Sequence, residues 1–132
     1  MQAPFLRVLS VREPYASFIV YSGKDVENRE WPTNYRGPLV IHAAVKVCEV
    51  GADYARHFDA MPNQSVRPGH ILGVVDLVDC VSVVDAKSPW AEGPWCFVLK
   101  NPRPVPSPFA VKGKLGLWMP TAEILEAVVD LI

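Results

Sequence analysis

Apolar and polar residues alternate in several short runs along the chain, which is the pattern of strands that have one face in a core. Runs of this kind, or valine-rich apolar runs, predict strands at Phe5–Val11, Asp25–Arg29, Leu39–Ala43, Ile71–Val84, Trp95–Lys100 and Leu115–Trp118. Gly73 predicts a bend in the longest of these strands. The stretch Asn101–Pro108 is dense in proline and predicts a connector.

Apolar residues at helical spacing occur in further segments. A short helix is predicted to begin at Pro14, which suits a first turn, and to end before Gly23, which suits the left-handed position after a helix. A longer helix is predicted over Lys46–Met61, and Thr121 is expected to cap a terminal helix with an apolar stripe. Short strands without regular strand–helix alternation predict an α+β domain, in which two or three helices flank a small, strongly bent mixed sheet or barrel.

Composition narrows the class of protein. The chain has 132 residues, of which 50% are hydrophobic and 20% charged, and this predicts one soluble globular domain over residues 1–132. The apolar runs are too short to cross a bilayer and the first residues lack the order of a signal peptide, so we expect a cytoplasmic protein without membrane contact. The net charge of −1 argues against non-specific coating of nucleic acid but is compatible with a local basic cleft.

Cysteine, histidine and aspartate do not predict a metal site. The three cysteines are widely spaced and odd in number, which is typical of reduced thiols rather than of a disulfide framework or a paired zinc motif. Asp76 and Asp79 differ by three positions, so on a regular strand they face opposite sides and make a poor metal pair. We therefore predict neither a metal nor a cofactor.

A charged trio, Lys24, Glu27 and Arg29, follows the expected helix stop and is ill suited to a core. A lysine beside a carboxylate and a guanidinium can polarise a carbonyl or phosphoryl oxygen, so Lys24 is the first candidate catalytic residue. Glu27 is the candidate general base or water-orienting group, and Arg29 the candidate phosphate anchor or partner of Glu27. The alternatives are a plain ion pair between Glu27 and Arg29, and a Lys24 that only favours the helix dipole.

Cations and aromatic rings elsewhere in the chain are candidates for the same cleft. The cations are Arg12, Lys24, Arg29, Arg36, Lys112 and Lys114, and the rings are Tyr15, Trp31, Tyr35 or Trp90. Each base stacked on such a ring contributes roughly 1–3 kcal/mol, so two rings and several cations can hold a short single strand despite the net charge of −1. The alternative is that Trp31 and Trp118 serve packing and that the charges form a solvated surface.

Six ordered blocks carry a resemblance to a known family. They are Leu9–Ala16 (LSVREPYA), Gly23–Arg29 (GKDVENR), Tyr35–Ala43 (YRGPLVIHA), Gly73–Val78 (GVVDLV), Val98–Pro102 (VLKNP) and Lys112–Trp118 (KGKLGLW). On these blocks the chain resembles the ASCH family, the activating-signal-cointegrator homology domain, within the group that has the PUA-like fold. The resemblance implies a small β-barrel flanked by helices, with a cleft lined by the lysine–glutamate–arginine block.

The resemblance also implies a function connected with RNA or nucleotides. The expected partner is single-stranded RNA or a nucleotide or nucleoside, bound by a module that acts on RNA or only binds it. One branch of the group consists of amidohydrolases of acylated cytidine nucleosides with a candidate nucleophilic threonine three residues after the lysine; this chain has Glu27 there. A ribonuclease or amidohydrolase is therefore the alternative, and a protein-interaction module using the Trp90–Trp95 loop and the terminal helix is a further one. Whether the protein is an enzyme stays open, as does its oligomeric state.

Overall fold

Six strands form one curled mixed sheet in the computed structural model, which describes residues 6–46 and 67–132. The strands are β1 (Arg7–Arg12), β2 (Val26–Arg29), β3 (Gly37–Ala44), β4 (His70–Ser82), β5 (Trp95–Ala110) and β6 (Leu117–Trp118). They lie in the order β2-β5-β4-β3-β1-β6, with β1 and β3 parallel and every other neighbouring pair antiparallel. The expected α+β class with a bent mixed sheet is confirmed.

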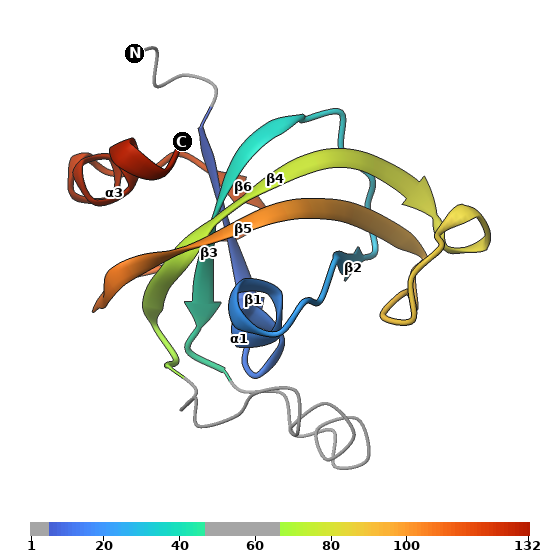
Figure 1. Ribbon diagram of the computed structural model, residues 1–132, viewed down its shortest axis with the longest axis horizontal. Coiled ribbons are helices and arrows are strands. Elements are labelled where there is room, and N and C mark those ends of the chain that lie inside the picture. Colours follow the sequence, from blue (N-terminus) through green and yellow to red (C-terminus); the bar gives the residue numbers. More distant parts are fainter. Residues whose placement is uncertain (1–5, 47–66) are drawn as a thin grey trace.

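Four short helical segments accompany the sheet in the described part of the chain. They are α1 (Tyr15–Tyr21), η2 (Val83–Asp85), α3 (Ala122–Val128) and η3 (Val129–Leu131). Figure 1 shows β4 and β5 arching together across the molecule, with α1 and α3 well separated from each other. The helices α1 and α3 pack against different parts of the sheet. The site described below is lined by β2, at one end of the strand order, and by β1 and the loop before β6, at the other end.

Hydrophobic residues form two buried clusters because alternate residues of a strand point to opposite faces. The cluster that includes α1 contains Leu9, Val11, Leu39, Ile41, Leu72, Val75, Leu77, Phe97 and Leu99. The cluster that includes α3 contains Val8, Val40, Ile71, Val74, Val105, Trp118, Ile124 and Val128. In β1 and β3 the members alternate between the two clusters, so both faces of the sheet centre are buried.

The sheet bends where β4 and β5 lose regular register. Register shifts occur between Ile71 and Gly73, between Val74 and Asp76, and between Leu77 and Asp79. A Cβ atom on Gly73 would lie 2.5 Å from the backbone oxygen of Arg103, so only glycine permits this close approach. A register shift and a close backbone approach therefore occur at Gly73, where the sequence predicts a bend.

The short helix lies between Pro14 and Gly23 and the terminal helix begins after Thr121, as the sequence predicts. Pro14 precedes α1, and Gly23 follows it with a φ of 79°, a left-handed conformation that favours glycine. The hydroxyl of Thr121 accepts a hydrogen bond from the amide of Ile124 at 3.3 Å and so caps α3. The predicted helix over Lys46–Met61 lies outside the described residues, except for Lys46 at its start.

Three predicted boundaries were wrong. The strand predicted over Ile71–Val84 ends at Ser82, because Val83–Asp85 forms η2. The stretch Asn101–Pro108 is not a connector, since β5 continues through it to Ala110. Its four prolines occur at every second position, so the N–H groups that they lack would all have pointed to one side of the strand. One side of β5 can do without these donors, because β2 pairs with β5 only up to Val98. The strand predicted over Leu115–Trp118 is shorter, because β6 contains only its last two residues.

Candidate functional site

The charged trio forms one chain of ion pairs on β2 and the turn that precedes it. Lys24 Nζ lies 3.4 Å from Glu27 Oε1, and Arg29 Nε lies 3.1 Å from Glu27 Oε2. The second contact is an ion pair rather than an aligned hydrogen bond, because no hydrogen-bond partner meets Arg29 Nε. Arg29 is oriented by its Nη2, which donates to the carbonyl oxygen of Ser10 at 2.7 Å. The trio therefore has two cations around one carboxylate, with one net positive charge.

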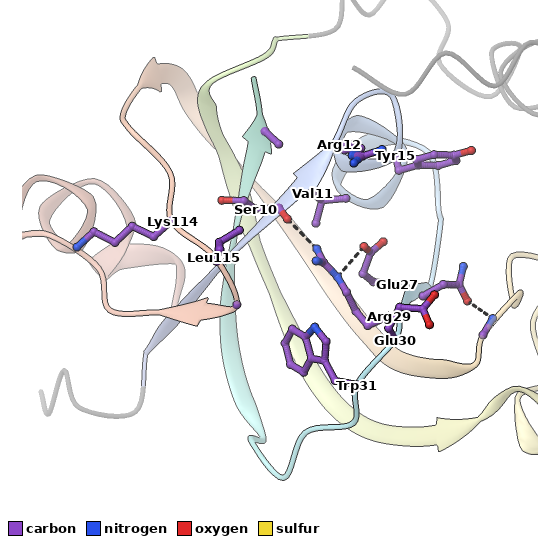
Figure 2. A pocket seen from close by; sticks show the side chains of 14 residues that line it. Ser10, Val11, Arg12, Tyr15, Glu27, Arg29, Glu30, Trp31, Lys114 and Leu115 are labelled. Carbon is purple, nitrogen blue, oxygen red and sulfur yellow. Dashed lines mark hydrogen bonds and ion pairs between the residues drawn. The ribbon is translucent and has the colours of Figure 1, made fainter. Parts of the chain in front are cut away.

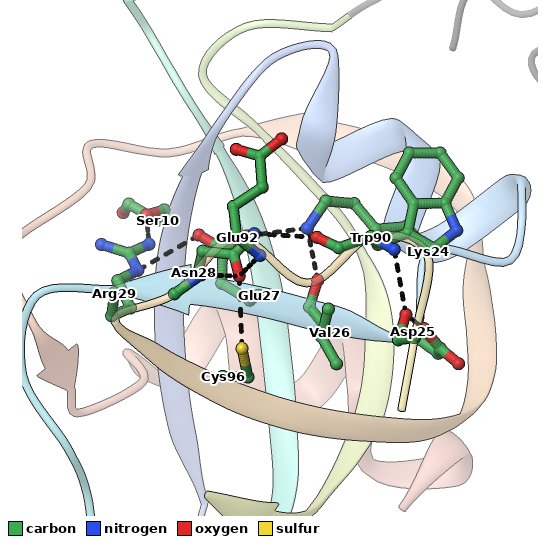
Figure 3. Close-up of polar contacts among 12 residues, drawn as sticks. Ser10, Lys24, Asp25, Val26, Glu27, Asn28, Arg29, Trp90, Glu92 and Cys96 are labelled. Atoms are coloured by element: carbon green, nitrogen blue, oxygen red, sulfur yellow. Dashed lines mark hydrogen bonds and ion pairs between the residues drawn. The ribbon is translucent and has the colours of Figure 1, made fainter. Parts of the chain in front are cut away.

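Lys24 is buried, with only 4% of its surface exposed. Its ammonium donates to the carbonyl oxygen of Val26 as well as to Glu27 (Figure 3). The Nζ atom also lies 5.7 Å from the ring centroid of Tyr15 and 6.0 Å from that of Trp90. These distances are in the range of cation–π attraction, so aromatic rings replace part of the hydration that burial removes.

Asn28 holds the loop that covers Lys24. Its Nδ2 donates to the carbonyl oxygen of Trp90 at 3.1 Å, and its Oδ1 accepts from the amides of Glu92 at 2.8 Å and Gly93 at 2.9 Å (Figure 3). These three bonds connect β2 to a loop more than sixty positions further along the chain. The loop is thereby fixed with the Trp90 ring near the buried ammonium.

A cavity of about 630 Å³ opens beside the trio. Its lining comprises Ser10, Val11, Arg12, Tyr15, Glu27, Asn28, Arg29, Glu30, Trp31, Ala44, Gly93, Lys114, Leu115 and Gly116. Figure 2 shows Arg29 reaching from its strand toward Ser10, with Trp31 on one side of the guanidinium and Arg12 and Tyr15 further off on the other. The volume is within the range typical of small-molecule sites.

The structure brings together most, but not all, of the residues predicted for the site. Arg12, Tyr15, Glu27, Arg29, Trp31 and Lys114 line the cavity, whereas Lys24 lies behind Glu27 and is absent from the lining. Arg36 lies elsewhere, in an exposed ion pair with Asp79 at 3.5 Å. Lys112 belongs to a neighbouring cavity of about 390 Å³ together with Thr121 and Glu123.

The aromatic rings of the cavity are each partly packed and partly open. Trp31 meets Phe97 edge-on, with 5.3 Å between ring centroids, and Tyr15 meets Phe18 edge-on at 6.2 Å. Both rings are partly buried against the first hydrophobic cluster and still line the cavity. The packing expected as an alternative for Trp31 therefore coexists with a surface that a ligand can reach.

Sequence reasoning missed several cavity residues. Ser10 contributes its backbone carbonyl, which a side-chain pattern does not indicate, and Glu30 follows β2 just beyond the predicted strand. Asn28 was missed because strand alternation places it opposite Glu27 and Arg29. The signal that could have found Asn28 is its side chain, since a partly buried carboxamide needs hydrogen-bond partners, and here it has three backbone partners.

A second polar cluster lies under the loop that carries Lys114. The indole N–H of Trp118 donates to Ser10 Oγ at 3.2 Å, and Ser10 Oγ lies 2.9 Å from His42 Nδ1. His42 Nε2 lies 3.0 Å from the carbonyl oxygen of Val111, which can only accept, so Nε2 carries the proton and Nδ1 accepts from Ser10. Burial lowers the pKa of His42 from its ordinary value of 6.5, against the opposing effect of the Val111 carbonyl.

Among residues 6–46 and 67–132, no group of three or more His, Cys, Asp or Glu side chains is placed to hold a metal ion. Asp76 and Asp79 are each paired with an arginine instead, Arg103 at 3.0 Å and Arg36 at 3.5 Å. No helix in the same described part is long and apolar enough to span a bilayer.

The curled mixed sheet with flanking short helices defines a half-barrel of the PUA-like class. Two crystal structures of ASCH from Zymomonas mobilis share this fold, the first with a TM-score of 0.59 and a tyrosine-to-phenylalanine mutant with 0.58. Both are 18% identical to this chain; the alignments cover 96% of it and 94% and 97% of the two solved chains. At this identity the likeness establishes the fold alone.

Sequence comparison identifies the family. This chain belongs to the ASCH domain family, whose sequence model matches residues 9–108. It is 36% identical to human activating signal cointegrator 1 and 33% identical to the Mus musculus protein, each over 124 residues. These alignments cover 83% of this chain but 21% of either relative, so the chain spans about a fifth of their length.

Proposed function

We propose that this protein binds RNA or a nucleotide in the cavity beside the charged trio. The observation that carries the proposal is the joint placement of cations and open aromatic rings around one concavity, with Arg12, Arg29 and Lys114 beside Tyr15 and Trp31. Single-stranded nucleic acids are held by this combination, in which bases stack on rings and phosphates meet lysine or arginine.

The charge of the cavity floor supports an anionic ligand. Glu27 is neutralised by Lys24 on one side and Arg29 on the other, which leaves the trio with a net positive charge. Glu30 at the rim is exposed, so its carboxylate is screened by water and salt. Arg29 is held by Ser10 and Glu27 before any ligand arrives, and such preorganisation reduces the entropy that binding costs.

Binding of a labelled short single-stranded RNA, measured by fluorescence anisotropy at several salt concentrations, tests the proposal. Affinity should fall steeply with salt, and Arg12→Ala combined with Arg29→Ala should weaken it and lower the slope by about 0.7 for each phosphate that is no longer neutralised. The matched control is Lys100→Ala, because Lys100 is an exposed cation on β5 outside this cavity. Absent binding, or binding that is insensitive to salt, contradicts the proposal.

Hydrolysis of RNA or of an acylated nucleoside is the second proposed function. It is favoured by Glu27, which lines the cavity while Lys24 and Arg29 hold its carboxylate in place. A carboxylate in that position can orient and deprotonate a water molecule, a role that does not need the threonine nucleophile of the amidohydrolase branch. Turnover that survives in Glu27→Gln would exclude this role and indicate another site or a contaminant.

The protein-interaction alternative receives less support from the geometry. Trp90 packs on Phe18 with 5.7 Å between ring centroids, and Ile124 and Val128 of α3 are buried in the second cluster. Both features that suggested a partner surface are therefore used within the fold. The binding proposal does not depend on the role in gene activation that the name of the activating signal cointegrator 1 relatives implies. Cytoplasmic location and independence of metal and cofactor stay predictions from the sequence.

A further inference from the structure

Leu115 is an exposed apolar side chain at the edge of the proposed site. Its exposed fraction is 97%, and it lines the same cavity as Arg29 and Trp31. A leucine so placed forgoes the free energy that burial would give. Single exposed apolar residues are common, so the surroundings of this one decide whether it has a role.

The loop that carries Leu115 is anchored on both sides. Before it, His42 Nε2 donates to the carbonyl of Val111, and a Cβ atom on Gly113 would lie 2.5 Å from His42 Cε1 and 2.8 Å from Ser10 Oγ. After it, Gly116 turns the chain with a φ of 68°, and β6 pairs with β1. The leucine is therefore presented from a fixed position, and its exposure follows from the backbone geometry of the loop.

The charges near Leu115 indicate the chemistry of a partner. Lys112 and Lys114 flank Gly113 in the same loop and are exposed, and Arg12 lines the cavity with Leu115. Figure 2 shows the Lys114 side chain extending away from Arg29, toward the outside of the rim. A partner that meets both an apolar side chain and cations on either side of it must offer flat apolar surface together with negative charge. Stacked bases between phosphates have this combination.

We propose that Leu115 is a wedge that enters a base stack next to the nucleotide bound in the cavity. This inference rests on the proposed function and specifies its ligand as a structured RNA, such as a hairpin, in which one base must leave the stack. Leucine is one of the apolar residues that nucleic-acid-binding proteins insert between base steps. The departing base stacks on Trp31 or Tyr15, while Leu115 fills the space that it leaves and the lysines of the loop hold the flanking phosphates.

The probe for the test is an RNA hairpin with 2-aminopurine next to the loop base that leaves the stack, because the fluorescence of 2-aminopurine increases when its stacking neighbour departs, whereas the departing base itself stacks again on Trp31 or Tyr15. The wild-type protein should increase the fluorescence on binding. Leu115→Ser should bind the hairpin about tenfold more weakly, as expected for the loss of one stacking interaction, and should not increase the fluorescence. Leu115→Met, which keeps an apolar side chain of similar size, should retain both properties.

Two controls keep the test specific. Val84→Ser removes a different apolar side chain, 86% exposed in η2, and should leave hairpin binding unchanged. Binding of a 5′-mononucleotide should be the same in the wild type and in Leu115→Ser, since a free nucleotide has no stack to open. Because Leu115 is almost fully exposed, we expect its replacement to leave the fold intact.

The outcomes separate this inference from the function on which it rests. Hairpin binding that is unchanged in Leu115→Ser, while the mononucleotide still binds, overturns the wedge and leaves the proposed function standing. A wild-type protein that binds neither the hairpin nor the mononucleotide overturns both. Self-association of the protein that disappears in Leu115→Ser would assign the leucine to a protein contact and would also overturn the wedge.

Discussion

Replacement of Glu27 by glutamine should destabilise the protein strongly, because Glu27 balances two cations in a largely buried position. The Glu27 and Lys24 side chains are 10% and 3% exposed. At the observed separations of 3.4 Å to Lys24 and 3.1 Å to Arg29, each attraction is about 5 kcal/mol at an effective dielectric constant of about 20, before desolvation is subtracted. Glutamine keeps the shape of the side chain and removes both attractions.

The expected loss is about 3–5 kcal/mol in the free energy of unfolding, the range measured when one partner of a buried ion pair is removed. Most of it arises from Lys24, which keeps its charge but then has only uncharged partners, among them the carbonyl of Val26 and two aromatic rings. Urea unfolding followed by circular dichroism measures the change. Adding Lys24→Met to Glu27→Gln should recover part of the loss, because the double variant no longer buries an unbalanced charge.

The matched control is Glu30→Gln, an exposed carboxylate that lines the same cavity. Its effect should stay within about 0.5 kcal/mol, as is usual for surface substitutions. A Glu27→Gln variant that is as stable as Glu30→Gln would refute the reasoning, since it would show that water already solvates the trio. A double variant that is less stable than Glu27→Gln alone would also count against it.

Three further predictions concern the supports of the site. Gly113→Ala should lower the free energy of unfolding by about 1–3 kcal/mol, because its Cβ atom would overlap His42; unchanged urea denaturation would contradict this. The pKa of His42, measured by NMR, should lie below 6.5, because burial disfavours the charged ring. The contribution of His42 to the free energy of unfolding should therefore be fully present above pH 6.5 and should decline as the pH falls from 6.5 toward the lowered pKa; a pKa above 6.5 would be the contrary result. Asn28→Ala should speed hydrogen exchange of the Glu92 and Gly93 amides, whose acceptor it removes; equal protection would show that other contacts hold the loop.

Local sequence signals were sufficient to predict the ends of helices that carry a capping residue or a terminal glycine. Gly23 marks the end of α1, because glycine readily adopts the left-handed conformation that follows a helix. Thr121 marks the start of α3, because its hydroxyl accepts from a free amide of the first turn. The length of β5 could not be predicted in this way. Prolines indicate a loop locally, and only the sheet order shows that one side of β5 is free of a neighbouring strand beyond the end of β2 in the described part of the chain.

The sequence predicted most of the residues of the candidate site but not how deeply they are buried. Alternation on β2 placed Glu27 and Arg29 on one side and Val26 on the other, yet Val26 and Glu27 are 2% and 8% exposed. Glu27 is enclosed by its ion-pair partners Lys24 and Arg29, and Asn28 fixes a distant loop beside the strand. Alternation reports which residues share a face and does not report what the rest of the chain lays over that face.

The most direct test of the account is NMR mapping of a nucleotide or short single-stranded RNA onto the protein. Tryptophan side chains give separate indole N–H signals, and the account predicts that the Trp31 signal and the Arg29 Nε–H signal shift on addition of the ligand. The Trp118 signal should stay in place, since its N–H is bound to Ser10 and its ring packs in the second hydrophobic cluster. Shifts at Trp118 without shifts at Trp31 and Arg29 would contradict the claim that this cavity binds the ligand.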